Sequence, residues 1–409
     1  MSSLKHWVWL SSSVGSVVAV SLLTHFGSPE RVYSASAAEY GGVQGIKRDD
    51  ISKLTDKNLS SADDILSSCV RIGCRIITIQ DAEYPDRLKN TYDPPLILYV
   101  RGRMPIIDDE AAVAIVGTRN CTPYGLTAAD EISCSLAKRG LLVVTGLARG
   151  IDTAAARGAL RGGGRVVGVI GSGLDVVYPP ENRQLFEDVA RDGAVISEYP
   201  PGTKAYAWNF PARNRILSGL SLGVAVLEAP VKSGALITAT RALEQGRDVF
   251  AMPGNINARN SEGSNALLRE GAIPLLSADN IIEEYAELYP DKILLDREAG
   301  NHEMQENLQP ENDNRKVKNN DENVEHSDTK KEIDNETAVE YIDVDQLLSG
   351  LEGDEKTVAE VIGTSVLQTD EIVMKSKLSA SQVLTALTML ELKGYCKRDA
   401  GGYFRLVRS

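Results

Sequence analysis

Six short apolar segments recur between residues 112 and 280 of this 409-residue chain, and helix-forming stretches separate most of them. Their side chains are mainly Val, Ile, Leu and Ala, which is typical of strands that are buried on both faces. Strands that alternate with helices along the chain form a parallel sheet with helices packed on both sides. We therefore predict a doubly wound α/β fold for this part of the chain. The predicted strands are Val113–Val116, Leu141–Thr145, Val166–Ile170, Ala194–Ser197, Val224–Leu227 and Val249–Met252.

Glycine-rich turns follow several of these strands, among them Gly117-Thr118-Arg119 and Gly171-Ser172-Gly173. Such turns let backbone N–H groups approach an anion closely, and open α/β sheets bind ligands at the carboxyl ends of their strands. Because Arg119 directly follows the first strand, we expect it to contact a ligand. The second turn resembles a dinucleotide fingerprint, but its glycine pattern stops at Gly173, so an NAD site is not predicted.

An aromatic and basic cluster precedes the fifth predicted strand: Trp208 and Phe210 stand beside Arg213 and Arg215. Guanidinium groups hold phosphates in a fork geometry, and an aromatic ring offers a face on which a base can stack. The cluster is therefore the combination expected for a ligand that carries both phosphates and bases.

Two carboxylates near the turns receive structural interpretations. Asp152 follows Gly150-Ile151 at a predicted helix start, where a carboxylate caps free N–H groups, so we predict a capping role for it. Glu228 ends its strand without a histidine or a second carboxylate close in sequence. A structural or ligand-orienting role is therefore predicted for Glu228 at least as strongly as acid–base chemistry.

The net charge of −13 is concentrated in one segment, because residues 281–345 hold 20 Asp and Glu against 7 Lys and Arg. The remaining chain is balanced, and the composition predicts a disordered acidic linker over 286–345. All four histidines lie outside 112–280, and the five cysteines show no paired metal spacing. We therefore predict no metal, no other cofactor, and the reduced thiols of a cytoplasmic protein.

The flanking segments differ from the α/β part. Residues 1–68 read as short helices, and the apolar stretch Trp7–Leu23 is predicted as a buried helix rather than a secretory signal because five serines and a glycine interrupt it. Residues 69–111 favour two strands, at Arg75–Ile79 and Leu96–Val100. The pattern over 346–409 predicts short helices, then a helix over Ser379–Lys393 and a hairpin. This is the order of elements in a winged helix.

Seven blocks of sequence follow one another across 114–272: AIVGTRNCTPYG, VTGLARGIDTAAARGAL, GVIGSGLDVVYPPEN, ISEYPPGT, NFPARNRILSGLS, LEAPVKSGALITATRALEQGRDVFAMPGN and EGSNALLREGA. Together they resemble one known family, the DNA-processing protein A (DprA/Smf) family. The resemblance is strongest over about 75–285 and extends loosely to the helical N-terminus and the C-terminal winged helix. It implies an extended Rossmann-like fold that binds single-stranded DNA, protects it, and loads RecA recombinase onto it in natural transformation. The family implies a homodimer and no enzyme activity.

The resemblance carries DNA-binding roles onto matched positions of this sequence. One departure is visible, because the family usually has a histidine where this chain has Ala156. The implied domains are a helical domain resembling helix-hairpin-helix or SAM-like modules (1–68), the single-strand-binding domain (69–285), the linker (286–345) and the winged helix (346–409). The implied DNA-binding residues are Arg119, Phe210, Arg213, Asn214 and Arg215, with Ser233 and Gly234 less firmly matched.

The alternative function is a nucleotide phosphoribohydrolase of similar architecture. Those enzymes resemble the PVKSGALITA region but carry a glycine-rich turn followed by a catalytic glutamate. Here Lys232 and Ser233 replace the two glycines, and Thr238 and Thr240 stand where the carboxylate is needed. Without an acid or base, cleavage of a glycosidic bond lacks its essential group.

No membrane partner is predicted, and the winged helix is expected to bind duplex DNA or a partner only weakly.

Overall fold

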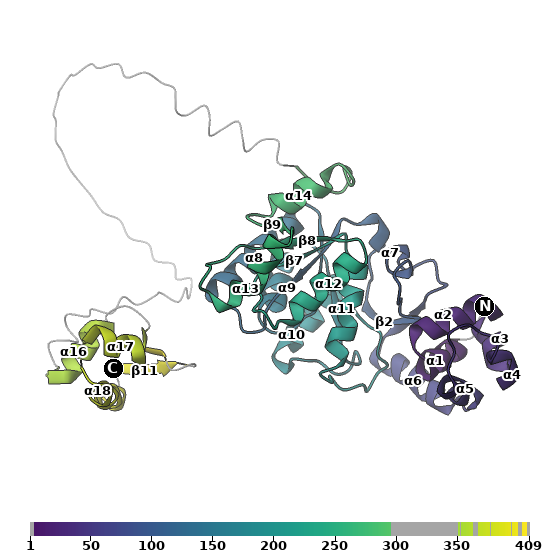
Figure 1. Cartoon of the computed structure of the whole chain (residues 1–409), viewed down its shortest axis with the longest axis horizontal. Helices are drawn as coiled ribbons and strands as arrows, with labels where there is room; N and C mark the ends of the chain where they lie inside the picture. The colour runs from purple at the N-terminus through teal and green to yellow at the C-terminus, as the bar shows by residue number, and fades with distance from the viewer. Residues whose placement is uncertain are drawn as a thin grey trace, which may run out of the picture. The chain divides into compact units, whose positions relative to one another are not determined.

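The computed structural model describes residues 4–295 and, beyond them, 351, 353–362, 367–376, 378–393, 395–399 and 403–406. The chain divides into two compact units, Met1–Pro310 and Glu311–Ser409 (Figure 1). Most of the predicted acidic linker, from residue 296 onward, lies outside the described residues. The beginning of that predicted linker, 286–295, is packed on the first unit. Tyr289 accepts a hydrogen bond from Arg87 at 2.8 Å, and the N–H of Leu294 donates to the Arg139 carbonyl at 2.9 Å.

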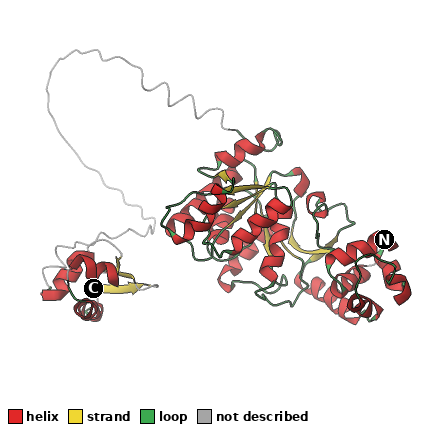
Figure 2. Cartoon of the chain, viewed as in Figure 1, coloured by secondary structure: helices red, strands yellow, loops and turns green. Residues whose placement is uncertain are grey.

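A mostly parallel sheet forms the centre of the first unit, as predicted. The strands lie in the order β1-β2-β6-β5-β4-β3-β7-β8-β9. The pairs β1–β2 and β2–β6 are antiparallel, and every other pair is parallel. Figure 2 shows the strands with helices on both sides. The strands are β1 Arg75–Thr78, β2 Ile97–Gly102, β3 Ala112–Val116, β4 Leu142–Thr145, β5 Val166–Ile170, β6 Ala194–Ser197, β7 Gly223–Val226, β8 Asp248–Ala251 and β9 Ile273–Pro274.

The order of the strands reverses beside β3. From β3 the chain moves outward through β4, β5 and β6, and β7 then returns to the free side of β3. The two strands run parallel, with Val113 opposite Gly223 and Val116 opposite Val226. The turns that leave β3 and β7 therefore diverge at the same edge of the sheet. This is the topological switch point at which open α/β sheets bind ligands.

Helices pack in layers on the sheet, with α9 in contact with both α8 and α10, and α11 against α12. Local sequence sets where they begin. Thr122 caps α8 by accepting a hydrogen bond from the Gly125 N–H at 3.1 Å, and Ser233 caps α12 by accepting one from Ala235 at 3.2 Å. The helices are α8 Pro123–Lys138, α9 Ile151–Arg161, α10 Arg183–Asp192, α11 Asn209–Gly219, α12 Gly234–Glu244, α13 Glu262–Arg269 and α14 Asp279–Ala286.

The N-terminal part is helical, but the single helix predicted over Trp7–Leu23 is two helices. They separate at Gly15, after serines whose hydroxyls bond back to the backbone: Ser12 donates to the Val8 carbonyl at 2.8 Å. The Lys57 ammonium lies 5.1 Å from the Trp9 ring centroid and 5.0 Å from that of Tyr40, which ties these helices together. The helices are α1 Leu4–Ser13, α2 Ser16–Phe26, α3 Pro29–Ser34, α4 Ala37–Tyr40, α5 Arg48–Thr55 and α6 Ser60–Ile72.

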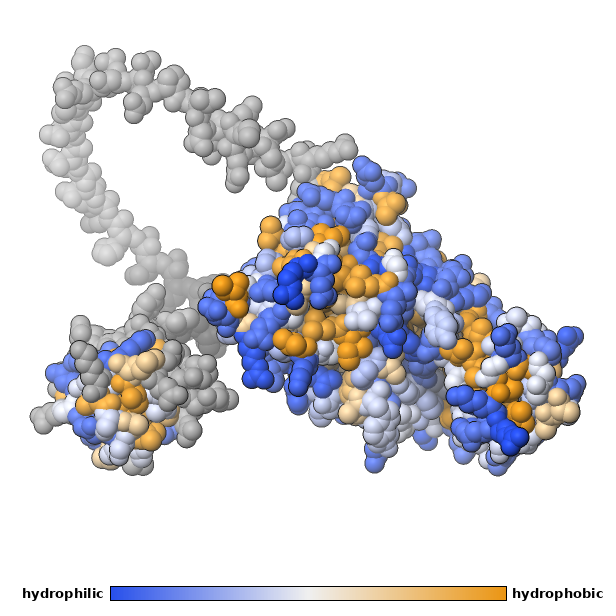
Figure 3. Space-filling view, in the orientation of Figure 1, coloured by the Kyte–Doolittle hydropathy of each residue, from blue (hydrophilic) through white to orange (hydrophobic). Residues whose placement is uncertain are grey.

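No helix within the described ranges is both long and apolar enough to cross a bilayer. The visible face in Figure 3 mixes hydrophilic areas with smaller hydrophobic patches. The chain's large apolar side chains instead concentrate in the core between the sheet and its helices, where Ile115, Leu98 and Phe250 are among the fully buried ones. Burial of these strand residues on both faces explains why their sequence lacks polar alternation.

The second unit is a winged helix, as predicted. Among its described residues, three helices precede and flank a small antiparallel sheet of order β10-β12-β11. The predicted helix over Ser379–Lys393 corresponds to α18, which begins with a reciprocal capping box between Ser379 and Gln382. The elements are α16 Gly353–Ile362, β10 Leu367–Gln368, α17 Thr369–Ser376, α18 Ala380–Leu392, β11 Cys396–Asp399 and β12 Tyr403–Leu406.

Candidate nucleic-acid interface

A cavity of about 460 Å³ opens at the switch point, between the turns that leave β3 and β7 and the first turns of α11 and α12. We call it the switch-point cleft. Six of the seven residues predicted from the sequence line it, and Arg215 does not. The cleft residues used below are Arg119, Asp152, Tyr178, Ala205, Ala207, Phe210, Arg213, Asn214, Lys232, Ser233 and Gly234.

Helix α11 decides which members of the FPARNR segment reach the cleft. Side chains three and four positions apart share one face of a helix, whereas neighbours two apart face different directions. Phe210, Arg213 and Asn214 follow this spacing and all line the cleft. Arg215, two positions beyond Arg213, points to the opposite side of α11. The sequence places two arginines in one cluster, and the helix separates them.

Arg119 and Phe210 meet at the rim of the cleft. The guanidinium carbon of Arg119 lies 4.8 Å from the centroid of the Phe210 ring, which is a cation–π arrangement. The ring of Tyr178 lies near the same phenylalanine, with centroids 5.5 Å apart and planes inclined by 51°. Arg119 is exposed and Phe210 is half-buried. The rim therefore presents a solvent-accessible cation and an aromatic surface side by side.

Arg213 supplies a second positive charge, deeper in the cleft. It is only 4% exposed, donates a hydrogen bond to the carbonyl of Val169, and has a buried Nε without a hydrogen-bond partner among the described residues. Burial, reinforced by the charge of Arg119, lowers the pKa of Arg213 to about 10, while Asp152 opposes that shift. The guanidinium is therefore still positively charged at neutral pH.

Asp152 lies beside Arg213, and the capping role predicted for it is wrong. The N-cap of α9 is Gly150, and no side chain caps that helix end. The Asp152 carboxyl is instead buried close to the guanidinium, with both side chains converging above Gly146. Burial raises its pKa, although Arg213, the Ala148 backbone and Arg119 counteract this effect. Burial therefore outweighs the attraction between the two charges. It raises the pKa of Asp152 and lowers that of Arg213, which favours the neutral form of each group.

The turn before α12 contributes a cation that the sequence reasoning did not select as a site residue. Lys232 lines the cleft directly before the Ser233 cap. The side-chain amide of Asn214 donates to the Gly234 carbonyl at 3.2 Å, so it holds α11 against the start of α12. Lys232 could have been selected from the sequence, because it is a basic residue in the turn that leaves a strand at the switch point. The charged groups among the described cleft residues are thus Arg119, Arg213 and Lys232 against Asp152.

Glu228 has a structural role, one of the two predicted for it. Its side chain is buried and accepts hydrogen bonds from the backbone N–H of Thr122, at 2.9 Å, and from the Thr122 hydroxyl. Its backbone carbonyl accepts from the Thr118 N–H at 2.7 Å. Glu228 therefore joins the end of β7 to the start of α8 and fixes the turn that carries Arg119.

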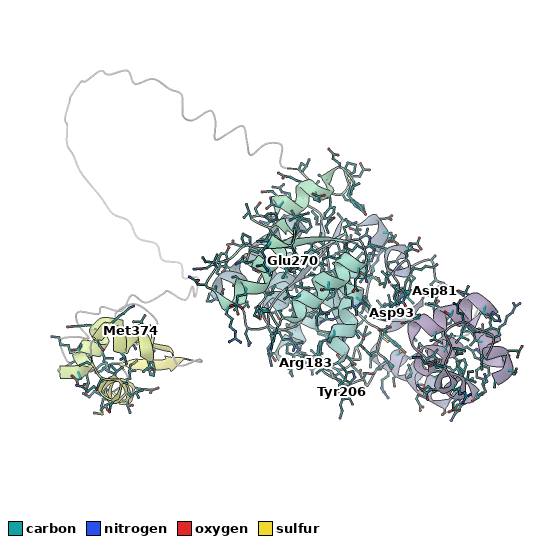
Figure 4. The ribbon with its side chains drawn as sticks, viewed as in Figure 1. Asp81, Asp93, Arg183, Tyr206, Glu270 and Met374 are labelled. Atoms are coloured by element: carbon teal, nitrogen blue, oxygen red, sulfur yellow. The ribbon has the colours of Figure 1, made fainter. Side chains whose placement is uncertain are left out.

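Arg215 contributes to a different cavity, of about 600 Å³, between α11 and the N-terminal helices. Its guanidinium pairs with Glu198 at 2.6 Å and with Asp93 at 3.1 Å. Burial disfavours its charge, but the two carboxylates together raise the pKa of Arg215 above its usual value. Ser16 at the start of α2 donates to Asp93, which Figure 4 places between the sheet and the N-terminal helices. The expected phosphate-binding role of Arg215 in the cleft thus conflicts with its position, because its donors are already paired elsewhere.

Within the described residues, no group of three or more His, Cys, Asp or Glu side chains is arranged to hold a metal ion. A doubly wound sheet with a basic, aromatic-lined cleft at its switch point defines a Rossmann-like α/β protein, and sheets of this kind generally bind ligands at that point. The family model "DNA recombination-mediator protein A" matches residues 75–286, and the model "DprA winged helix domain" matches residues 344–402. The chain belongs to the DNA recombination-mediator protein A (DprA) family.

Three DNA processing proteins A are among the relatives and solved structures to which this chain is similar. The chain is 42% identical to the DNA processing protein DprA of Bacillus subtilis over 54% of this chain and 75% of that protein. The crystal structure of DNA processing protein A from Streptococcus pneumoniae aligns with a TM-score of 0.61 and 32% identity, covering 69% of this chain and 99% of that chain. A Helicobacter pylori DNA processing protein A, whose structure addresses its single-stranded DNA binding mode, aligns at a TM-score of 0.48 and 31% identity over 53% of this chain and 97% of that chain.

Proposed function

We propose that this protein binds single-stranded DNA in the switch-point cleft and serves natural transformation, where it protects incoming strands and loads RecA recombinase onto them. The observation that carries the binding step is the contact of Arg119 with Phe210 at the rim of a cleft that also holds Arg213 and Lys232. Cations bind the phosphates of a strand, and the ring stacks on a base whatever its identity. Binding should therefore depend on salt and only weakly on sequence.

The position of the ring favours unpaired strands over duplex DNA. Phe210 is half-buried at the cleft rim and packs beside Tyr178. A base can reach it only with a free face, and the faces of bases in a duplex are covered by their stacked neighbours. The phosphate-binding cations alone do not make this distinction, because they neutralise either kind of backbone.

The wider role rests on the family. A recombination mediator must deliver its strand to a recombinase, which agrees with the proposed RecA partner and a cytoplasmic location. The homodimer is likewise an extension from family resemblance. Two clefts on one strand would raise the overall affinity through effective concentration, without any additional contact within either cleft.

We propose further that the protein is not an enzyme. Asp152 is the one acidic residue among the described cleft residues, and it lies against Arg213. Glycoside hydrolysis generally requires a pair of carboxylates, one acting as acid and the other as base or nucleophile. Purified protein incubated with nucleoside monophosphates should release no free base. Release that disappears in Asp152→Asn would instead support the phosphoribohydrolase alternative.

A mobility-shift comparison tests the proposed binding. Single-stranded and duplex oligonucleotides of equal length are titrated at two ionic strengths with the wild type, Arg119→Ala and Phe210→Ala. Arg191→Ala is the matched control, since Arg191 is an exposed, ion-paired arginine outside the cleft. We expect preference for the single strand and weaker binding by both cleft variants alone. Preference for duplex, or unchanged binding by both variants, would refute the proposal.

A further inference from the structure

Two exposed aromatic rings stack on each other in the loop between β6 and α11. The ring centroids of Tyr206 and Trp208 are 4.6 Å apart, and their planes are within 6° of parallel. Trp208 is 70% exposed and Tyr206 is 42% exposed. Stacking in this way covers one face of each ring and leaves the outer faces open. The pair thus presents a large flat aromatic surface to solvent.

The loop that carries the pair is fixed to the sheet at several points. The buried side chain of Asn209 donates to the Gly171 carbonyl at 2.9 Å. Earlier in the loop, the Thr203 carbonyl accepts from the Gly173 N–H at 2.9 Å, and the Gly202 N–H donates to Asp175 at 2.8 Å. These bonds attach both ends of the segment to the turn after β5. The aromatic pair is therefore held in place before any ligand binds, which lowers the entropic cost of binding.

The pair adjoins the switch-point cleft. Ala205 and Ala207 line the cleft, and Tyr206 and Trp208 alternate with them along the loop. Figure 4 shows Tyr206 pointing away from the body of the first unit at its lower edge. Trp208 precedes Phe210 by two residues, so their Cα atoms are at most about 7 Å apart. The aromatic pair therefore lies beside the cleft, in the loop that leads to Phe210.

We propose that the Tyr206–Trp208 pair is a second stacking platform, on which a base of the same DNA strand stacks next to the base bound at Phe210. The inference rests on the proposed function and extends its site from one base to a run of neighbouring bases. The exposed Lys204 stands two residues before Tyr206 and adds a positive charge to the same loop. An aromatic surface that lies beside both a basic side chain and a basic cleft favours a nucleic-acid strand over an apolar protein surface.

Tryptophan fluorescence reports directly on the platform. The chain contains three tryptophans, and the other two, Trp7 and Trp9, are only 2% and 5% exposed. A base that stacks on Trp208 should quench its emission, whereas a strand held only by its phosphates should not. An oligo-dT and an abasic oligonucleotide of equal length are titrated into the full-length protein. We expect quenching by oligo-dT only, and loss of the response in Trp208→Phe.

Affinity measurements test whether the contact contributes to binding. Anisotropy of a labelled oligo-dT is measured with the wild type, Trp208→Ala, Trp208→Phe and Tyr206→Ala. Tyr92→Ala is the matched control, because Tyr92 is an aromatic residue with 87% exposure that lies outside the cleft. We expect Trp208→Ala to weaken binding by about 5- to 150-fold, the range for loss of one stacked base, and Trp208→Phe to weaken it less.

The outcomes separate the platform from the proposed function. If oligo-dT binds in an Arg119-dependent manner without changing Trp208 emission, the proposal of a second stacking platform is refuted and the proposal of binding in the cleft is unaffected. If Trp208→Ala binds DNA normally but loses self-association, the pair is a protein interface and the inference is overturned. If wild-type protein does not bind oligo-dT, the proposed function is refuted, and the proposal of a second stacking platform is refuted with it.

Discussion

The Arg119 guanidinium carbon lies 4.8 Å from the centre of the Phe210 ring, although 90 residues of sequence separate the two. In the free protein the cation therefore covers the ring that we assign to a base. A base that stacks on Phe210 must share the ring with Arg119 or displace it. Displacement would release the guanidinium toward the phosphate of the same nucleotide, so the two contacts should be coupled.

Coupling between these residues can be measured with a double-mutant cycle. We expect Arg119→Ala to weaken single-strand binding about tenfold, as loss of one hydrogen-bonded charge would, and to reduce the salt slope by about 0.7. Phe210→Leu should weaken binding without changing that slope. The double variant should lose less than the sum of both effects. Strict additivity in the anisotropy titrations would show that the two groups bind independently.

Arg213 and Asp152 should be coupled in stability. Arg213→Met leaves a buried carboxylate without its charge partner, which typically costs about 3–5 kcal/mol. The pKa of Asp152 is already raised by burial and should rise further. A carboxyl with a raised folded-state pKa binds a proton more readily in the folded state, so stability increases as pH falls through that pKa. Urea unfolding of Arg213→Met should therefore show a smaller loss at pH 5 than at pH 8.

The control for that pH dependence is the double variant Arg213→Met with Asp152→Asn. It carries no titratable group at either position, so its loss of stability relative to the wild type should be similar at both pH values. If the single variant is equally destabilised at pH 5 and pH 8, the Asp152 carboxyl is not the group left unpaired, and the assigned relationship is incorrect.

Arg215 should affect stability more than DNA binding. Arg215→Ala removes the partner of Glu198 and Asp93, and its side chain is only 12% exposed. We expect a loss of about 3 kcal/mol in the free energy of unfolding. Affinity for single strands, corrected for the folded fraction, should remain within twofold of the wild type. A large loss of affinity in fully folded protein would return Arg215 to the binding site.

Gly146 should tolerate no side chain. A Cβ atom there would lie 2.5 Å from Oδ2 of Asp152 and closer still to Nη1 of Arg213. Gly146→Ala should therefore cost about 1–3 kcal/mol through overpacking and displace Arg213 from the cleft, which weakens DNA binding. Gly42→Ala, whose nearest neighbour would lie at an ordinary 3.5 Å, should be neutral in the same urea and anisotropy measurements.

Several features of the fold were predictable because they depend on local pattern. The strands predicted at Val166–Ile170 and Ala194–Ser197 match β5 and β6 at both ends. Of the other four, β3 and β4 differ by one residue at one end, and β7 and β8 are shifted by one residue at both ends. Buried strands need uninterrupted apolar side chains, so their positions can be predicted from the sequence. The split of the first helix at Gly15 was missed because the apolar character of Trp7–Leu23 continues across the break.

The sequence by itself determined the alternation of strands and helices, the glycine-rich turns and the residue types available for binding a strand. Only the tertiary structure decided which of those residues meet. It placed Arg119 over Phe210 because β3 and β7 are neighbours in the sheet, and it directed Arg215 away because helix periodicity turns it from Arg213. Local order follows from nearby residues, whereas the composition of a site depends on strand order and helix rotation, which link distant parts of the chain.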